Sequence, residues 1–368
     1  MLAKKAIPHL LILLALGGIT LLAYWPSFHV PFVFDDQHVI ETNEAIRDTG
    51  NFLTWDVLTR QRPLTDLTFA LNYAWNGIDS FGYHIVNFSI HLLAVWVGYF
   101  LGLSIFSGLP DWKGRKWTNI TIPSMAALAA LVFALHPVQT QAVTYIAQRY
   151  TSMAALFYLA AVLCFVWARD VMQFSSRASE LEHRIDAKVY IKAMVLFAFC
   201  FTFGLASFLS KQIALSLPLA LILLEYALYD QTREGWKRKI FLMLPFFLAF
   251  IGFILYSSGV LEGGISLGRL LEETDQRSRE TLDVTRLAYL FTQFQVVVVY
   301  LKIVFWPANL CLDYMYPFVD KILNVPSFLS LIVLLLIAGV GLWSRKKFPV
   351  IFIGVFWFFI ALSVESSM

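Results

Sequence analysis

The feature that most constrains this chain is a series of long apolar segments that recurs from one end of the sequence to the other. A helix needs about 20 mostly apolar residues to cross a bilayer. The segments that approach or reach this length are 6–25, 84–106, 120–136, 150–168, 191–209, 212–229, 240–258, 286–306, 326–343 and 348–363. They predict an all-α polytopic membrane protein, a bundle of about 9–10 transmembrane helices.

Composition supports this fold and limits the function classes. Hydrophobic residues make up 59% of the chain and charged residues 14%, whereas about 25% of residues are charged in an average soluble domain. The formal net charge of +3 is too small to indicate a nucleic-acid partner. Cys164, Cys200 and Cys311 have no metal-ligand or disulfide spacing. A multi-pass protein in membrane lipid, without nucleic acid, is therefore expected.

The first apolar segment has two interpretations. Lys4 and Lys5 precede its apolar core, as they would in a secretory signal peptide. The stretch LLAYWPSF that follows offers no small-residue cleavage site. An uncleaved membrane anchor is therefore favoured.

Lys and Arg are unevenly distributed among the connections between segments. They are dense in 111–116, 169–192 and 230–239, whereas the long loop 26–83 contains only Arg47, Arg60 and Arg62. Because cytoplasmic loops carry an excess of Lys and Arg, we expect a cytoplasmic N-terminus. Loops 26–83 and 136–150 are then on the outer, periplasmic or luminal, face.

The last segments leave two topologies open. If 286–306 crosses the membrane once, the basic SRKK at 344–347 lies outside, against the charge rule. If 286–306 is re-entrant or broken, SRKK returns to the cytoplasm and LDYMYP at 312–317 faces outward, which the charge rule favours. The chain then stops directly after an apolar run, which predicts a longer protein with further spans.

Both outer loops are predicted to contain short helices. The apolar residues of NFLTWDVL, at 51–58, suit a helix that lies in the membrane interface with Trp55 as an anchor. In HPVQTQAVTYIAQRY, at 136–150, Pro137 suits the first turn of a helix. On such a helix Tyr145 and Arg149 would share one face, one turn apart.

Ionisable and aromatic side chains gather on the expected outer face. The acidic pair in PFVFDD follows the first segment directly, and the candidate ligands for a lipid phosphate come later in the chain. The acids are Asp35 and Asp36, and the candidate ligands are Arg62, His84, His136, Tyr145, Arg149 and Lys211. Singly, each has an ordinary interpretation as part of an aromatic belt or as a basic side chain at the bilayer edge. Together, cations beside a carboxylate suit phosphate binding and proton abstraction.

Five stretches, in this order over residues 20–320, resemble one family: FVFDD, RPLTDLTFALNY, GYHIVNFSIH, FALHPVQTQAVTYIAQR and LSKQIALSLPLALILLEY. They are similar to the GT-C membrane glycosyltransferases, and most of all to the transmembrane and tetratricopeptide-repeat-containing O-mannosyltransferases and their bacterial relatives. The resemblance implies one GT-C-like glycosyltransferase domain over 1–368, a polyprenyl-phosphate sugar donor and an outward active site. It also implies a C-terminal tetratricopeptide array, which would follow this sequence.

The resemblance places the catalytic base on Asp35, with Asp36 orienting the loop or meeting a cation. Consecutive residues point in different directions, so the two acids are not expected to share one task. A phosphate leaving group needs cations rather than a general acid, so one carboxylate suffices, whereas glycosidases use two. Single displacement with inversion is expected. Gln141 and Gln212 stand where the family has Glu, which leaves the hexose and a divalent cation open; no other cofactor and no metal-ligand set is expected.

The rival function is a transporter or flippase of a lipid-linked substrate. Transporters place polar groups and helix breaks near the bilayer midplane, often in inverted repeats, whereas the ionisable residues here collect at the outer edge. The expected activity is therefore hexosyl transfer from the lipid-linked donor, with Ser/Thr of a protein favoured over a lipid as acceptor. The bacterial inner membrane is favoured over the endoplasmic reticulum.

Overall fold

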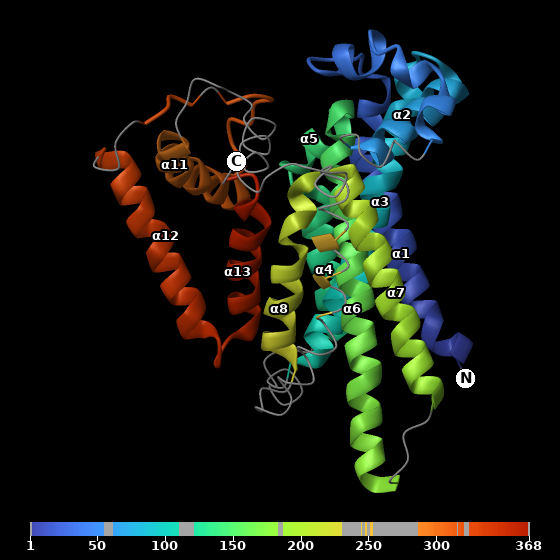
Figure 1. Ribbon diagram of the computed structural model, residues 1–368, viewed down its shortest axis with the longest axis vertical. Helices are drawn as coiled ribbons and strands as arrows, with labels where there is room; N and C mark the ends of the chain where they lie inside the picture. The colour runs from blue at the N-terminus through green and yellow to red at the C-terminus, as the bar shows by residue number, and fades with distance from the viewer. Residues whose placement is uncertain are drawn as a thin grey trace. The chain divides into compact units, whose positions relative to one another are not determined.

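The computed structural model describes residues 2–54, 62–109, 121–182, 187–229, 286–314, 316–319 and 324–366, with a few single positions between 244 and 252. All regular structure in these residues is helical (Figure 1). The chain forms two compact units, Met1–Leu217 and Pro218–Met368. The expected span 240–258 and the expected interfacial helix with Trp55 lie largely or wholly outside the described residues.

The expected membrane fold is confirmed. Six helices in the described ranges are long and apolar enough to cross a bilayer: Ile7–His29, Ser80–Gly108, Ile146–Gln173, Ala187–Ser210, Leu287–Phe305 and Val325–Ser344. Three shorter apolar helices, Ile122–Leu135, Gln212–Leu228 and Pro349–Ser363, match further predicted segments. The protein is an all-α polytopic membrane protein.

The first unit is built on α1 (Leu2–Tyr24), α3 (Ser80–Gly108), α4 (Ile122–Leu135), α6 (Arg149–Glu182) and α7 (Ala187–Ser210). Ala126, Ala130 and Ala134 are buried on one side of α4 and pack against α1 and α3. Small side chains allow membrane helices to approach closely, which replaces the hydrophobic driving force that lipid does not supply. The helices α6 and α7 lie side by side (Figure 1).

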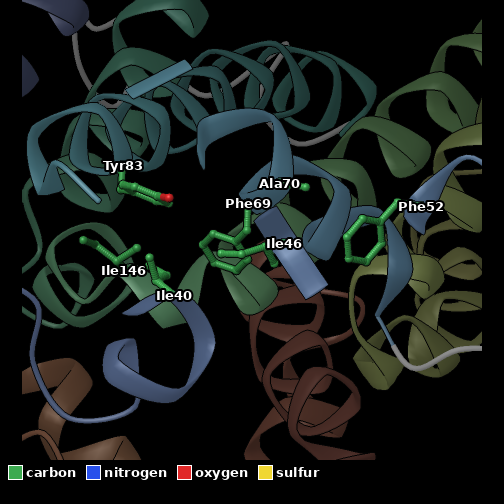
Figure 2. Close-up of a cluster of buried hydrophobic side chains, with 7 residues drawn as sticks. All are labelled: Ile40, Ile46, Phe52, Phe69, Ala70, Tyr83 and Ile146. Atoms are coloured by element: carbon green, nitrogen blue, oxygen red, sulfur yellow. The ribbon is translucent and has the colours of Figure 1, made fainter. Parts of the chain in front are cut away.

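The first loop folds into short helices at one end of this unit (Figure 1). They are η1 (Trp25–His29), η2 (Gln37–Glu41), η3 (Ala45–Arg47), η4 (Thr49–Phe52) and α2 (Pro63–Asn76). A buried apolar cluster fixes them to the bundle, and Figure 2 shows its members: Ile40, Ile46, Phe52, Phe69, Ala70, Tyr83 and Ile146. Full burial of an Ile or Phe side chain contributes about 1.5–3 kcal/mol, so the loop is a packed layer.

The expected continuous helix through 137–149 is wrong. Helix α5 (Gln139–Thr144) ends at Tyr145, which is extended at φ −79° and ψ 109°. A short turn, η7 (Ile146–Gln148), follows, and α6 begins at Arg149. Because of this break, Tyr145 and Arg149 do not lie on one face of a single helix.

In the second unit, α12 (Val325–Ser344) and α13 (Pro349–Ser363) form an antiparallel pair, and α11 (Arg286–Phe305) is unbroken. The expectation of a broken 286–306 is therefore not met. Tyr289 of α11 donates to the Glu365 carbonyl just past α13, at 2.9 Å. Gln295 of α11 donates to Ser327 in the first turn of α12, at 2.6 Å. One half of α11 thus meets a single end of the α12–α13 pair, and the re-entrant alternative stays a prediction.

Candidate active site

The helix break that begins at Tyr145 connects most of the predicted site residues. We call residues 145–151, YIAQRYT, the helix-break segment. Its side chains and backbone bond to the acidic pair, to α2, to α3 and to the residue that follows α7.

Asp35 is exposed and is held by one residue of the helix-break segment. The Tyr145 hydroxyl donates to Asp35 Oδ2 at 2.7 Å, and the Asp35 backbone N–H donates back to that hydroxyl at 3.2 Å. Burial, and then the bond to Asp35, raise the pKa of Tyr145, so its hydroxyl keeps its proton. The carboxylate is fixed at one oxygen and stays open to solvent.

The backbone turns sharply just before this carboxylate. Phe34 has φ 52°, in the left-handed region that a non-glycine residue rarely adopts. Its ring lies 6.3 Å from that of Tyr145, centroid to centroid. Strained residues of this kind persist where the surrounding structure holds them, and they concentrate at functional sites.

Asp36 is buried and bonds only inward. Its Oδ1 accepts from the Ala147 N–H at 2.7 Å, and its Oδ2 accepts from the Val33 N–H at 3.0 Å. Burial raises the pKa of Asp36, and the N–H donors of Val33 and Ala147 oppose that rise. The two acids therefore have different surroundings: one is open, and the other ties its own loop to the helix-break segment.

Arg149 is fully buried, at 0% exposure. Its nitrogens donate to Asn87 Oδ1 at 2.6 Å and to Asn72 Oδ1 at 2.9 Å. Two backbone carbonyls, of Thr68 and Tyr83, accept as well. The guanidinium carbon lies 4.3 Å from the centre of a phenylalanine ring of α2. Four donors are thus already used within the protein, which supports a structural role, and the predicted phosphate contact of Arg149 stays a prediction.

His84 also faces inward. The side chain is buried, and its Nε2 lies 2.9 Å from the Val30 carbonyl oxygen, immediately before PFVFDD. Its Nδ1 is buried without a hydrogen-bond partner. The contact fixes the start of the acidic loop to α3, whereas the predicted contact of His84 with the donor stays a prediction.

Arg62 lies at the start of α2 with an unusual backbone, φ 56° and ψ 37°. Its guanidinium carbon stands 5.1 Å from the ring centre of Tyr150. The Tyr150 hydroxyl donates a short hydrogen bond to Asp66, one turn into the same helix. Arg62 Nε is buried without a hydrogen-bond partner, so the geometry leaves a donor for a further group.

Lys211 directly follows α7, and its side chain reaches Thr151, the residue after Tyr150 in the helix-break segment. Its Nζ donates to Thr151 Oγ1 at 3.1 Å, and that hydroxyl donates to Gln148 Oε1 at 2.8 Å. Lys211 is partly exposed. Because Tyr150 and Thr151 are consecutive, the two cations meet the helix-break segment within one turn of α6.

The two remaining predictions have separate outcomes. The Nδ1 of half-buried His136 accepts from the Val138 N–H at 3.2 Å, at the entry to α5. Within the described ranges, no three His, Cys, Asp or Glu side chains are close enough to hold a metal ion. The predicted contact of His136 with the donor and the predicted divalent cation both stay predictions.

Sequence reasoning did not single out four polar residues that surround Arg149 and Arg62. Asn72, Asn87, Asp66 and Tyr150 contact Arg149, the helix-break segment or one another. For the two asparagines a signal existed, since each stands in a largely apolar helix. A buried amide in such a place requires a polar partner.

Parts of the chain are similar in sequence to known proteins. Residues 59–271 match the model of a family described as "NnrS protein". The chain is 32% identical to "Protein O-mannosyl-transferase TMTC4" of Mus musculus over 164 residues, which are 41% of this chain and 22% of the relative. It is 30% identical to "Protein O-mannosyl-transferase Tmtc3" of Drosophila melanogaster, over 39% of this chain and 18% of the relative. It thus spans about a fifth of these relatives. No solved structure shows a significant match.

Proposed function

The chain belongs to the NnrS protein family, and we propose that it is a GT-C membrane glycosyltransferase. In this proposal it moves a hexose, with mannose favoured, from a polyprenyl-phosphate donor to a hydroxyl of a protein Ser or Thr. The names of its O-mannosyl-transferase relatives support this class of reaction. Residues 1–368 would form the transmembrane glycosyltransferase domain of a longer protein with a C-terminal tetratricopeptide array.

The observation that carries the proposal is the geometry of Asp35. An exposed carboxylate with one oxygen fixed by a tyrosine can accept a proton from an approaching hydroxyl. The hydroxyl oxygen then attacks C1 of the sugar from the face opposite the phosphate. The bond between C1 and the phosphate oxygen breaks, and polyprenyl phosphate leaves. One displacement inverts the configuration at C1.

The leaving phosphate gains negative charge as it departs, so its stabilisation requires cations. Arg62 and Lys211 are the candidates, because both lie at the helix-break segment and neither is fully buried. A guanidinium can donate two parallel hydrogen bonds to a phosphate, and an ammonium acts as a point charge. Tyr145 acts through the base that it holds.

The site is proposed to face the periplasm or lumen, with the N-terminus in the cytoplasm. The few Lys and Arg residues of 26–83 support this orientation. The bacterial inner membrane is the proposed location. A flippase for the same donor has no comparable support, because the contacts of Asp35, Asp66 and Lys211 all meet the helix-break segment.

The test is sugar transfer by the purified protein in lipid vesicles, with polyprenyl-phosphate mannose and a Ser/Thr-rich peptide. The wild-type chain should form the glycopeptide with inverted C1 configuration. Asp35→Asn should lower the rate about 10²–10⁴-fold, the usual effect of losing a general base. Glu44→Gln is the matched control, because it removes an exposed carboxylate from the same loop. Movement of the donor across the bilayer without glycopeptide would support the flippase instead.

A further inference from the structure

Asn87 occupies a buried position between the backbone of Ile146 and the side chain of Arg149. It lies in α3 with 0% exposure. Its Nδ2 donates to the Ile146 carbonyl at 3.2 Å, and its Oδ1 accepts from Arg149 Nε at 2.6 Å. One amide thus contacts the backbone of the break and the first side chain of α6.

We infer that Asn87 is a positioning residue, which holds the helix break in the conformation that turns Tyr145 toward Asp35. The inference rests on the proposed function, in which Asp35 is the base. Asn87 itself does not contact the reacting atoms.

The direction of the Asn87 amide is fixed by its neighbour. A guanidinium has only donors, so Arg149 requires the oxygen of the amide. The NH₂ group must then point the other way, toward the Ile146 carbonyl. Arg149 therefore sets the orientation of Asn87, and Asn87 holds the backbone directly after Tyr145.

The break needs such a partner, because it removes backbone groups from the helical hydrogen-bond pattern. Buried carbonyl and N–H groups without partners destabilise a conformation strongly. The Ile146 carbonyl accepts from Asn87 and from the Arg149 backbone N–H, and Asp36 satisfies the Ala147 N–H. With both groups satisfied, Tyr145 is extended and its hydroxyl reaches Asp35.

Asn87→Asp isolates this role. The new carboxylate keeps an acceptor for Arg149, so the buried guanidinium stays paired. It has no N–H to offer, so the Ile146 carbonyl loses the Asn87 donor, keeps only the Arg149 backbone N–H and faces a carboxylate oxygen. Asn72→Asp is the matched control, because Asn72 also accepts from the Arg149 side chain, at 2.9 Å, but its NH₂ group donates to Asn76 within α2 and not to the Ile146 carbonyl.

The first readout is steady-state transfer by the full chain in lipid vesicles. Asn87→Asp should lower kcat about tenfold, in line with the loss of one buried hydrogen bond, and leave the donor KM near its wild-type value. Asn72→Asp should leave both constants near wild type. In a Tyr145→Phe background, Asn87→Asp should lower kcat little further, because both changes act through the same contact. A full additional tenfold loss, or equal losses in both Asp variants, would overturn the positioning role.

The second readout does not depend on activity and measures amide hydrogen exchange in a peptide that covers Tyr145–Gln148. Exchange should be faster in Asn87→Asp than in wild type and unchanged in Asn72→Asp, because only the first frees the break. Equal exchange in all three proteins contradicts the inference even if the wild type transfers no sugar. If the wild type transfers no sugar but exchange is faster only in Asn87→Asp, the proposed function is rejected. The role of Asn87 in holding the helix break is then still supported.

Discussion

Asp36 accepts a hydrogen bond from the Ala147 N–H at 2.7 Å, although 111 residues separate the two in the chain. The contact joins the acidic loop after α1 to the helix break before α6. Its neighbour in sequence, Asp35, meets Tyr145 from the same break. The two acids thus bind adjacent parts of one segment, one through its backbone and one through a side chain. Because the two acids have different contacts, we expect different effects when the contacts of Asp35 and of Asp36 are removed.

Tyr145→Phe should lower kcat for sugar transfer about tenfold while the donor KM stays near wild type. The change removes the hydroxyl that holds the carboxylate of Asp35 and keeps the ring, and a hydrogen bond to a charged group contributes about 1.5–3 kcal/mol. The measurement is steady-state transfer to a Ser/Thr peptide. Tyr73→Phe, in α2, is the control for loss of a hydroxyl. A variant with wild-type kcat would show that Asp35 does not need this contact.

Asp36→Asn should destabilise the first loop by about 1–3 kcal/mol at neutral pH, because an amide cannot accept from both N–H groups. Its effect should also depend on pH. Burial raises the folded-state pKa of Asp36 above the unfolded value, so the folded protein binds the proton more readily. The wild type therefore gains stability from this group as the pH falls from neutral through the raised pKa, and the gain levels off below the unfolded value.

The corresponding measurement is the free energy of unfolding of wild type and Asp36→Asn, compared across this pH range in detergent. The difference in favour of the wild type should grow as the pH falls. A difference that shrinks in acid would mean that the folded state lowers the pKa of this carboxyl, against its burial.

Arg62→Gln and Lys211→Gln should each raise the KM for the polyprenyl-phosphate donor about tenfold or more, because a charged hydrogen bond to phosphate is lost. The acceptor KM should change little. Lys346→Gln, at the exposed connection after α12, controls for loss of one positive charge. An unchanged donor KM in both variants would show that Arg62 and Lys211 do not bind the donor phosphate. Their roles would then be limited to the contacts with Tyr150 and Thr151.

Much of this fold was predictable, because apolar segment length fixes where membrane helices form. The same pattern, with the Lys and Arg counts, predicts that Asp35, Arg62, Tyr145 and Lys211 share one side, and the structure links them through one segment. What local sequence could not predict is the break after Thr144. The stretch favours continuous helix, and the groups that stabilise the break, on Asn87 and Asp36, are about 60 and 110 residues away.

The same reason explains why the sequence did not predict the buried surroundings of Arg149. From sequence, an arginine near a bilayer edge is interpreted as a snorkelling or phosphate-binding side chain, because the sequence does not show which groups surround it. In the structure Asn72 and Asn87, from two other helices, accept its hydrogen bonds. Only the tertiary fold brings these acceptors together.

The last prediction concerns the side of the membrane on which the loop after α11 lies. Val319 donates to Thr292 in α11, and Tyr316 donates to Gln295. With the contacts of Tyr289 and Gln295 to the end of α13 and the start of α12, these bonds place half of α11 at one end of the α12–α13 pair. The basic SRKK lies at the other end, in the turn between α12 and α13.

Since basic turns prefer the cytoplasm, Cys311 should face outward. It is exposed, whereas Cys164 and Cys200 are buried, so a membrane-impermeant maleimide should label the wild type in intact cells at Cys311. Cys311→Ser should abolish that labelling. Adding Lys346→Cys to Cys311→Ser should restore it only after the membrane is made permeable. Labelling of position 346 in intact cells, with Cys311 protected, would mean that α11 crosses the bilayer once and that SRKK lies outside, against the charge rule.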